Sequence, residues 1–210
     1  MDTVRTKGKV IAIVGSPGCG KTFLASKLAK YYKAETVFEA PEGGYPEQIK
    51  DNLGSQRNLF ETIVWFRNHQ ISNYEKALAI ANSGRMVVMD APFYHNQLFV
   101  RLYIRSEFER EILYSLGYND RKLFGYPDCT VYIFSTPEMA KNFIEKRKGT
   151  HSWENEAWVS FITQMPPLVE DYMAKLKSKI PNLVEINRGN FDFENESDLN
   201  ELVNKINLFL

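Results

Sequence analysis

The sequence has few cysteines, no net charge and no long hydrophobic run. Its two cysteines, Cys19 and Cys129, lie far apart and match neither a disulfide framework nor a zinc-binding spacing. Lysine and arginine together equal aspartate and glutamate in number, so the formal net charge is zero. A balanced charge gives no electrostatic signal for a long nucleic acid or an anionic membrane. These absences predict a protein of the reduced cytoplasm whose partners are small molecules.

The hydrophobic segments are too short for membrane or secretory functions. None approaches the roughly 20 apolar residues that cross a bilayer. The first apolar run, residues 10–14, is too short for the core of a signal peptide, and no cleavage site follows it. A chain of 210 residues can bury one full hydrophobic core. Because no change of composition marks a boundary, we expect a single domain over residues 1–210.

Short apolar strands alternate with helices along the whole chain. Strands are expected at residues 9–14, 36–39, 85–89, 129–134 and 183–186. Helices are expected at residues 20–32, 46–53, 57–82, 97–116, 137–146, 153–179 with a break at Pro166-Pro167, and 196–210. Apolar strands separated by helices are typical of a parallel sheet covered on both faces. The pattern therefore predicts a three-layer α/β sandwich.

The strongest motif is Gly-Ser-Pro-Gly-Cys-Gly-Lys-Thr at residues 15–22. It matches the P-loop pattern G-x-x-x-x-G-K-[ST] and lies between an expected strand and an expected helix. Glycines let the backbone wrap a phosphate, and the following helix N-terminus adds its positive end. The residues expected to bind the phosphates of ATP are Gly15, Ser16, Pro17, Gly18, Cys19, Gly20, Lys21 and Thr22. Lys21 should reach the β- and γ-phosphates and Thr22 should ligate Mg²⁺, while Cys19 is expected to be a small filler.

A carboxylate follows the third expected strand. Asp90 comes directly after the apolar run at residues 86–89. In P-loop proteins an acid in this place serves the Mg²⁺ site, so this strand should lie beside the P-loop strand with Asp90 near Thr22. The alternative is an N-cap, or a strand end that faces a surface loop. With the first interpretation we expect a P-loop NTPase fold whose five strands follow the order 2-3-1-4-5.

A P-loop alone does not distinguish a kinase from a GTPase or an ATP-driven motor. The base-reading N-K-x-D sequence of GTPases is absent. A motor of the AAA type is usually longer, with a helical lid domain and arginine fingers supplied by a neighbouring subunit. These exclusions leave a compact nucleotide kinase.

Five segments, in order over nearly the full length, resemble the deoxynucleoside kinases and the related thymidylate kinases. They are the P-loop, VFEAPEGG at 37–44, WFRNHQ at 65–70, Asp90, and FIEKRK at 143–148. Apart from the P-loop each match is weak alone, and their order carries the resemblance. Asp90-Ala91-Pro92-Phe93 is in addition similar to the ribosylnicotinamide kinases, which belong to the same broad group.

The resemblance implies an acceptor site beside the P-loop. Deoxynucleoside kinases use a glutamate just after strand two as the base on the substrate hydroxyl, and Glu39 or Glu42 corresponds to it. The choice stays open because Ala40 separates Glu39 from the proline that should follow directly. The expected substrate contacts are Trp65, Phe66, Arg67 and Gln70 on the long helix, together with Phe93. The alternative for Trp65 and Phe66 is packing in the core.

The resemblance also implies a lid, at about residues 147–155, with Arg147 holding the transferred phosphoryl group. One departure concerns the residue after the strand-three acid, which is arginine in the family and Ala91 here. We expect Arg147, or less favourably Arg101, to replace that arginine. The predicted function is ATP- and Mg²⁺-dependent phosphorylation of a nucleoside or a nucleoside monophosphate, and a homodimer is compatible with the sequence. The alternative is a nucleotide-binding regulator that has lost the acceptor chemistry.

Overall fold

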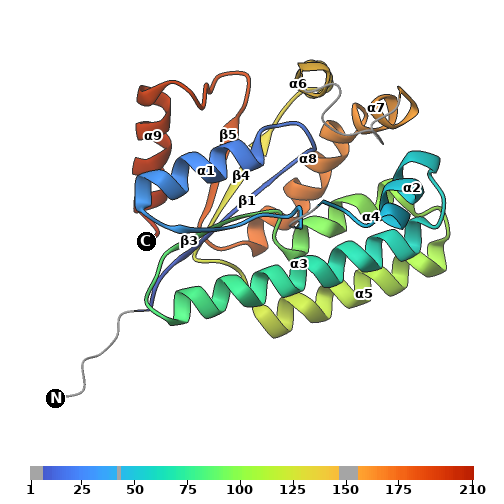
Figure 1. Ribbon diagram of the computed structural model, residues 1–210, viewed down its shortest axis with the longest axis horizontal. Coiled ribbons are helices and arrows are strands. Elements are labelled where there is room, and N and C mark those ends of the chain that lie inside the picture. The colour runs from blue at the N-terminus through green and yellow to red at the C-terminus, as the bar shows by residue number, and fades with distance from the viewer. Residues whose placement is uncertain (1–6, 42–43, 147–155) are drawn as a thin grey trace.

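The computed structural model describes residues 7–41, 44–146 and 156–210 (Figure 1). Its five strands are β1 (Val10–Gly15), β2 (Glu35–Val37), β3 (Val87–Asp90), β4 (Cys129–Phe134) and β5 (Leu183–Asn187). They form one sheet in the order β2-β3-β1-β4-β5, and every neighbouring pair is parallel. The predicted fold class and strand order are therefore confirmed.

The helices mostly follow the sequence pattern, with two differences. They are α1 (Lys21–Tyr32), α2 (Glu47–Ser55), α3 (Leu59–Asn82), α4 (Gln97–Tyr103), α5 (Glu107–Phe124), α6 (Pro137–Lys146), α7 (Glu156–Ile162), α8 (Met165–Leu176) and α9 (Glu196–Asn207), with 3₁₀ turns η1 (Phe93–Asn96) and η2 (Lys177–Lys179). The single helix expected at 97–116 is wrong, because Ser106 starts α5 by accepting a hydrogen bond from the Glu109 amide. The break expected at Pro166 and Pro167 is present but falls just before them, between the end of α7 at Ile162 and the start of α8 at Met165. The two prolines lie in the first turn of α8, where a missing N–H costs nothing.

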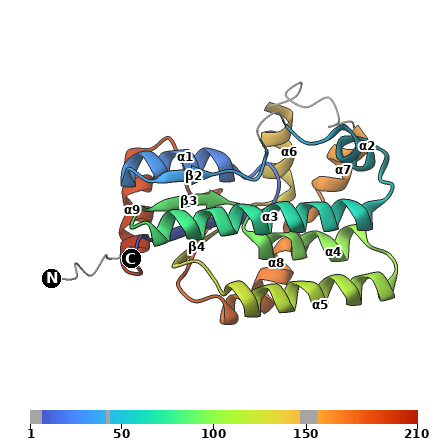
Figure 2. The ribbon, with the colours of Figure 1, turned by 60° about the horizontal axis from the view of Figure 1, so that its bottom comes forward.

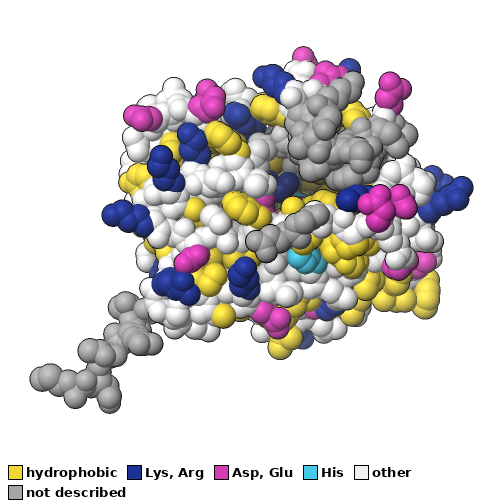
Figure 3. Space-filling view, viewed as in Figure 1, with side chains coloured by type: hydrophobic (Ala, Val, Ile, Leu, Met, Phe, Trp, Pro, Cys, Tyr) yellow, Lys and Arg dark blue, Asp and Glu magenta, His cyan; other side chains and the backbone are white. Residues whose placement is uncertain are grey.

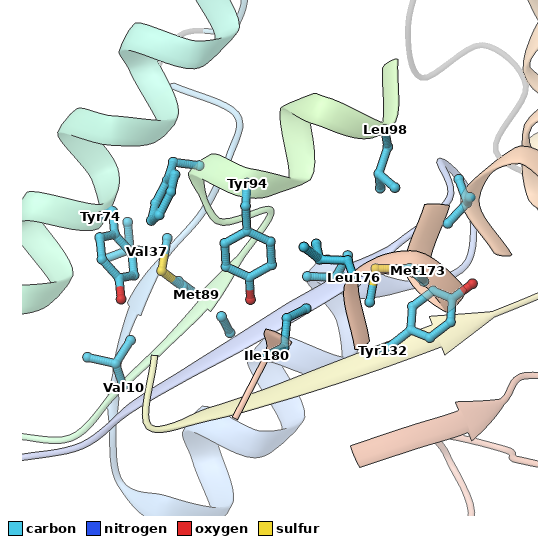
Figure 4. Packing of buried hydrophobic residues seen from close by; sticks show 14 of the residues in the cluster. Val10, Val37, Tyr74, Met89, Tyr94, Leu98, Tyr132, Met173, Leu176 and Ile180 are labelled. Atoms are coloured by element: carbon cyan, nitrogen blue, oxygen red, sulfur yellow. The ribbon is translucent and has the colours of Figure 1, made fainter. Parts of the chain in front are cut away.

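Helices cover both faces of the sheet (Figures 1 and 2). On one face α1 and α9 bury Leu24, Leu28, Leu202 and Ile206 against β1, β3, β4 and β5. On the other face α3 and α8 pack on the sheet, with α4 and α5 beyond them. The core on that side gathers aromatic and sulfur side chains from several elements, which Figure 4 shows: Tyr74, Met89, Tyr94, Tyr132 and Met173. The result is the three-layer arrangement that the alternating pattern predicted.

A third hydrophobic cluster extends the protein beyond the carboxyl ends of the strands. It joins α2, α3, α4 and α5 through the buried side chains of Ile49, Leu53, Ile63, Val100 and Leu113. Because this cluster lies next to the end of the sheet where the P-loop begins, it provides the far wall of the cavity described below.

On the face seen in Figure 3, charged side chains of both signs are interspersed rather than gathered by sign. This distribution agrees with the zero formal net charge of the sequence. None of the helices in the described part of the chain is long and apolar enough to cross a membrane.

Candidate active site

The P-loop leaves β1 and enters α1 in the conformation that a phosphate cradle requires. Gly18 and Gly20 have left-handed φ angles of 79° and 95°, where a side chain would be strained. A Cβ atom at Gly15 would lie 2.6 Å from the carbonyl oxygen of Ile133 on the neighbouring strand. Cys19 is fully buried, and burial raises the pKa of its thiol. The thiol is therefore a filler behind the loop, as expected from the sequence.

Lys21 is held by the loop it belongs to. Its Nζ donates to the carbonyl oxygens of Gly15 at 3.1 Å and Ser16 at 3.2 Å. The Gly15 carbonyl also contacts Nε2 of His95 at 2.8 Å. Burial, and next the charge of Lys21, lowers the pKa of His95 to about 3. His95 is thus neutral with its proton on Nε2, and the Gly15 carbonyl has it as a second donor besides Lys21.

Asp90 lies beside the P-loop and next to Thr22, as the sequence predicted. It is paired with Ile13 in the β1–β3 register, which brings its carboxylate next to the start of α1. The Thr22 hydroxyl donates to Asp90 Oδ2 at 2.5 Å. The backbone N–H of Glu39 donates to the other carboxylate oxygen, Oδ1. Asp90 is only 3% exposed, so it does not face a surface loop.

Glu39 follows β2 and is enclosed by the same site. Its Oε1 accepts a hydrogen bond of 2.7 Å from Nε2 of Gln70 on α3. Burial raises the pKa of Glu39 to about 7, and nearby Asp90 adds to the rise, whereas Lys21 and the Gln70 hydrogen bond oppose it. A carboxyl group with a pKa near neutrality can exchange a proton at physiological pH.

A cavity of about 390 Å³ runs from the P-loop to the third hydrophobic cluster. Its polar lining consists of Lys21, Thr22, Glu39, Thr62, Gln70, Asp90, His95 and Asn96. The apolar and aromatic lining includes Phe38, Tyr45, Leu53, Leu59, Ile63, Phe66, Phe99, Tyr103, Phe143 and Ile162. Of the described residues that line it, Lys21 alone carries a positive charge. The molecule is hollowed near the centre of the face shown in Figure 3.

Comparison with known proteins identifies the family. A family model described as an AAA domain matches residues 10–165, which is most of the chain. The chain belongs to this AAA domain family. No curated protein gives a significant match. The match establishes that the chain contains a P-loop domain of this family. The expectation that the protein is not part of an ATP-driven motor stays a prediction.

Solved structures with a similar fold are deoxyadenosine kinases from M. mycoides. The complex with dCTP has a TM-score of 0.72 at 13% identity, over 94% of this chain and 98% of that one. The complex with the products dCMP and a flexible dCDP has a TM-score of 0.72 at 15% sequence identity, over 94% of this chain and 98% of that one. The complex with dATP has a TM-score of 0.73 at 16% sequence identity, over 94% of this chain and 99% of that one. These values confirm the predicted resemblance to deoxynucleoside kinases at the level of the fold.

The AAA domain places three of the expected substrate contacts away from the cavity wall. Trp65 stacks on His69 and packs against Tyr45 and Phe66. Phe93 is buried in the core against the rings of Tyr74 and Phe124. Arg67 forms an ion pair with Asp120 of α5. Two other candidates from the long helix, Gln70 and Phe66, do line the cavity.

None of the described residues that line the cavity of this AAA domain is an arginine, so no replacement for the family's arginine lies there. Ala91 has a left-handed φ of 49° and is 1% exposed, so an arginine side chain would not fit there without a rearrangement. Arg101 is exposed and pairs with Asp171 at 3.1 Å, outside the cavity lining. Glu42, Arg147 and the lid at 147–155 lie outside the described residues.

The ion pair between Arg67 and Asp120 gives a stability prediction. The two side chains are 21% and 7% exposed, and the guanidinium meets both carboxylate oxygens. Arg67→Ala would leave Asp120 buried without its partner, so we expect a loss of about 3 kcal/mol in the free energy of unfolding. Urea denaturation would measure it. The control Arg101→Ala removes an exposed pair and should cost less than about 1 kcal/mol. Equal losses in the two variants would contradict this assignment.

Proposed function

We propose that the protein is an ATP- and Mg²⁺-dependent phosphotransferase whose acceptor is a nucleoside. The main support is the pair of contacts made by Asp90, whose two oxygens accept from the Thr22 hydroxyl and from the Glu39 amide. One carboxylate thereby joins the end of the P-loop to a partly buried glutamate that lines the cavity. A nucleotide site, a proton acceptor and a cavity for a second substrate are the parts that phosphoryl transfer to a hydroxyl needs.

The residues present fit a magnesium ion that is shared with phosphate oxygens. The Thr22 hydroxyl and the Asp90 carboxylate lie 2.5 Å apart at the N-terminus of α1 and would hold it. In the described part of the chain no three His, Cys, Asp or Glu side chains could hold a metal together. Two protein ligands suit Mg²⁺, which keeps waters and binds substrate phosphates. When bound, the ion would neutralise charge on the phosphates.

In the proposed reaction the chain's own residues position two substrates and move one proton. Lys21 and the loop amides hold the triphosphate of ATP. The acceptor hydroxyl oxygen forms a bond to the γ-phosphorus, the bond from that phosphorus to the β,γ-bridging oxygen breaks, and ADP leaves. Glu39 takes the hydroxyl proton, for which its raised pKa of about 7 is suited. Glu39 is one of the two glutamates left open by the sequence, and its contacts with Asp90 and Gln70 support this role.

The lining of the cavity favours a neutral nucleoside over a monophosphate. A monophosphate acceptor carries charge that needs cationic side chains, whereas Lys21 is the one cation among the described lining residues. The aromatic wall suits a nucleobase. Oε1 of Gln70 is buried and has no partner among the described residues, so it can accept a hydrogen bond from a base. The deoxyadenosine kinases with a similar fold support the same substrate class.

A panel of nucleosides and nucleoside monophosphates, assayed with ATP for ADP release, tests the proposal. We expect at least one nucleoside to stimulate ADP release well above the rate without acceptor, and the monophosphates to have little effect. Lys21→Ala protein, purified in the same way, gives the background from contaminating enzymes. Stimulation by monophosphates alone would contradict the nucleoside assignment.

The second candidate is a nucleotide-binding regulator, which the buried Ala91 in place of the family's arginine favours. ATP binding without stimulation by any acceptor would support it over the kinase.

A further inference from the structure

We propose that His69 is a positioning residue that fixes the Glu39 segment to α3, with Asn73 as its companion. The proposal rests on the function proposed above for Glu39. The segment at 65–70 that carries the family resemblance assigns His69 no role of its own. The structure gives it a contact with the backbone of the residue that would accept the proton.

Three side chains on consecutive turns of α3 hold residues 38 and 39. Nε2 of His69 lies 2.8 Å from the carbonyl oxygen of Glu39. Nδ2 of Asn73 donates to the carbonyl oxygen of Phe38 at 3.0 Å. Gln70 holds the Glu39 carboxylate itself. Because positions 69 and 73 are one helical turn apart, they present the two backbone contacts from the same face of α3.

The acceptor atoms fix the protonation of the imidazole. A carbonyl oxygen can only accept, so Nε2 of His69 carries a proton in this contact. Asn73 Nδ2 also lies 3.3 Å from the same nitrogen, but two N–H groups cannot bond to each other. The Asn73 amide therefore donates to the Phe38 carbonyl oxygen. His69 and Asn73 bind the adjacent carbonyl groups of Glu39 and Phe38 and do not bond to each other.

Trp65 keeps the imidazole in the required orientation. Its ring lies four residues earlier on α3 and stacks on His69, with centroids 5.2 Å apart and planes 10° apart. Trp65 is fixed in turn by edge contacts to Tyr45 and Phe66. This stack gives a role to Trp65, which does not line the cavity.

Glu39 is thus held from both sides. Its N–H donates to Asp90 at the end of β3, while its carbonyl and carboxylate groups are bound by His69 and Gln70 of α3. Strand β2 ends two residues earlier, at Val37, so the sheet does not fix this residue. Without the His69 contact, the carboxylate would lose its fixed distance from the cavity and the P-loop. Misplacing a reacting group by about 1 Å can cost up to about 100-fold in rate.

Two substitutions distinguish the effect of the His69 hydrogen bond from the effect of its ring. His69→Phe keeps a ring against Trp65 and removes the donor, and His69→Gln removes the ring and supplies an amide donor. We expect His69→Phe to lower kcat by roughly 10- to 100-fold, with little change in the Michaelis constants of ATP and acceptor. His69→Gln should recover at least part of that loss. Ser72→Ala, an exposed change on the same helix, is the control and should leave kcat unchanged.

A double-mutant cycle tests whether His69 acts through Glu39. In a Glu39→Gln background, His69→Phe should lower kcat further by less than about twofold, because the group it positions is already lost. If the losses in kcat from His69→Phe and Glu39→Gln are independent and multiply in the double variant, the proposal is overturned and His69 has only a structural role. A folded His69→Phe variant with wild-type kcat would also overturn the proposal. If His69→Phe does not fold, Asn73→Ala takes its place in the cycle with the same expectations.

Amide hydrogen exchange gives a measurement that does not depend on activity. The Glu39 N–H is protected by Asp90, and we expect it to exchange about tenfold faster in His69→Phe than in the wild type, with protection restored in His69→Gln. If the wild type shows no acceptor-stimulated ADP release, the proposed function fails, while faster exchange in His69→Phe still supports the positioning role of His69. Unchanged exchange of the Glu39 N–H in His69→Phe would overturn that role even in an active enzyme.

Discussion

Lys21→Ala is expected to lower kcat/KM for ATP by about 10²- to 10³-fold, the loss seen when one oriented donor is removed from a developing negative charge. Nζ of Lys21 donates to the carbonyl oxygens of Gly15 and Ser16. His95 holds the Gly15 carbonyl independently, so the lysine can leave it at little cost. Acceptor-stimulated ADP release at several ATP concentrations measures the effect.

The fold should survive this change, because alanine is the best helix former and Lys21 begins α1. Thermal unfolding of the variant checks that point. Lys30→Ala, an exposed change in the last turn of the same helix, is the control and should keep wild-type kinetics. A folded Lys21→Ala protein with unchanged ATP affinity and turnover would rule out the phosphate-binding role of this loop.

The nucleotide half of the site could be predicted because its geometry is local. Residues 15–22 are contiguous, and their conformation follows from glycines between a strand and a helix. Asp90 is distant in sequence, but the alternation of strands and helices restricts the sheet to few orders, and the observed one places Asp90 against Thr22. The strand order and this contact could therefore be derived together.

The proposed acceptor half of the site could not be predicted to the same degree, because the rotation of α3 about its axis decides which of its side chains face the cavity. Along α3, Gln70 faces the cavity, whereas Arg67, three residues earlier, turns toward Asp120 on α5. No pattern near Arg67 in the sequence predicts its pairing with Asp120, which lies 53 residues later. Phe93 is likewise buried by Tyr74 and Phe124, both distant in sequence. An apolar periodicity indicates which face is buried but not what it meets.

The same limit applies to His69 and His95. Each is a lone histidine in its segment, and only the folded chain brings a carbonyl group within 2.8 Å of its ring. No spacing rule connects a histidine to a backbone carbonyl 30 or 80 residues earlier. The signal that was present for His69 is the aromatic Trp65 one helical turn before it, a spacing that allows ring stacking.

Glu39→Gln is expected to lower kcat by about 10²- to 10⁴-fold, the contribution of a well-placed general base. The amide has the shape of the carboxyl group and can still accept the Gln70 hydrogen bond, but it cannot take a proton. In the wild type, Glu39 with a pKa of about 7 is protonated at lower pH, so kcat/KM should fall as the pH drops through 7. The residual kcat/KM of the Glu39→Gln variant should not show this fall at low pH. Initial rates between pH 5.5 and 9 measure both effects.

Stability should move in the opposite direction from activity, which separates loss of the base from loss of the fold. The pKa of Glu39 is raised in the folded protein from an ordinary value of 4.5 to about 7, so its ionisation is easier in the unfolded chain. The stability contributed by the protonated form is full below pH 4.5 and is lost as the pH rises through 7. Glu39→Gln should therefore unfold at a higher temperature than the wild type at pH 8, with the difference shrinking toward pH 5.

Glu35→Gln provides the matched control for this glutamate. Glu35 begins the strand that ends just before Glu39, and its exposed ion pair with Arg85 contributes little stability. It should keep wild-type kcat, pH profile and unfolding temperature. A Glu39→Gln variant with near wild-type kcat would assign the proton acceptor to another group. A variant that is inactive but also unfolds at a lower temperature at pH 8 would instead assign Glu39 a structural role.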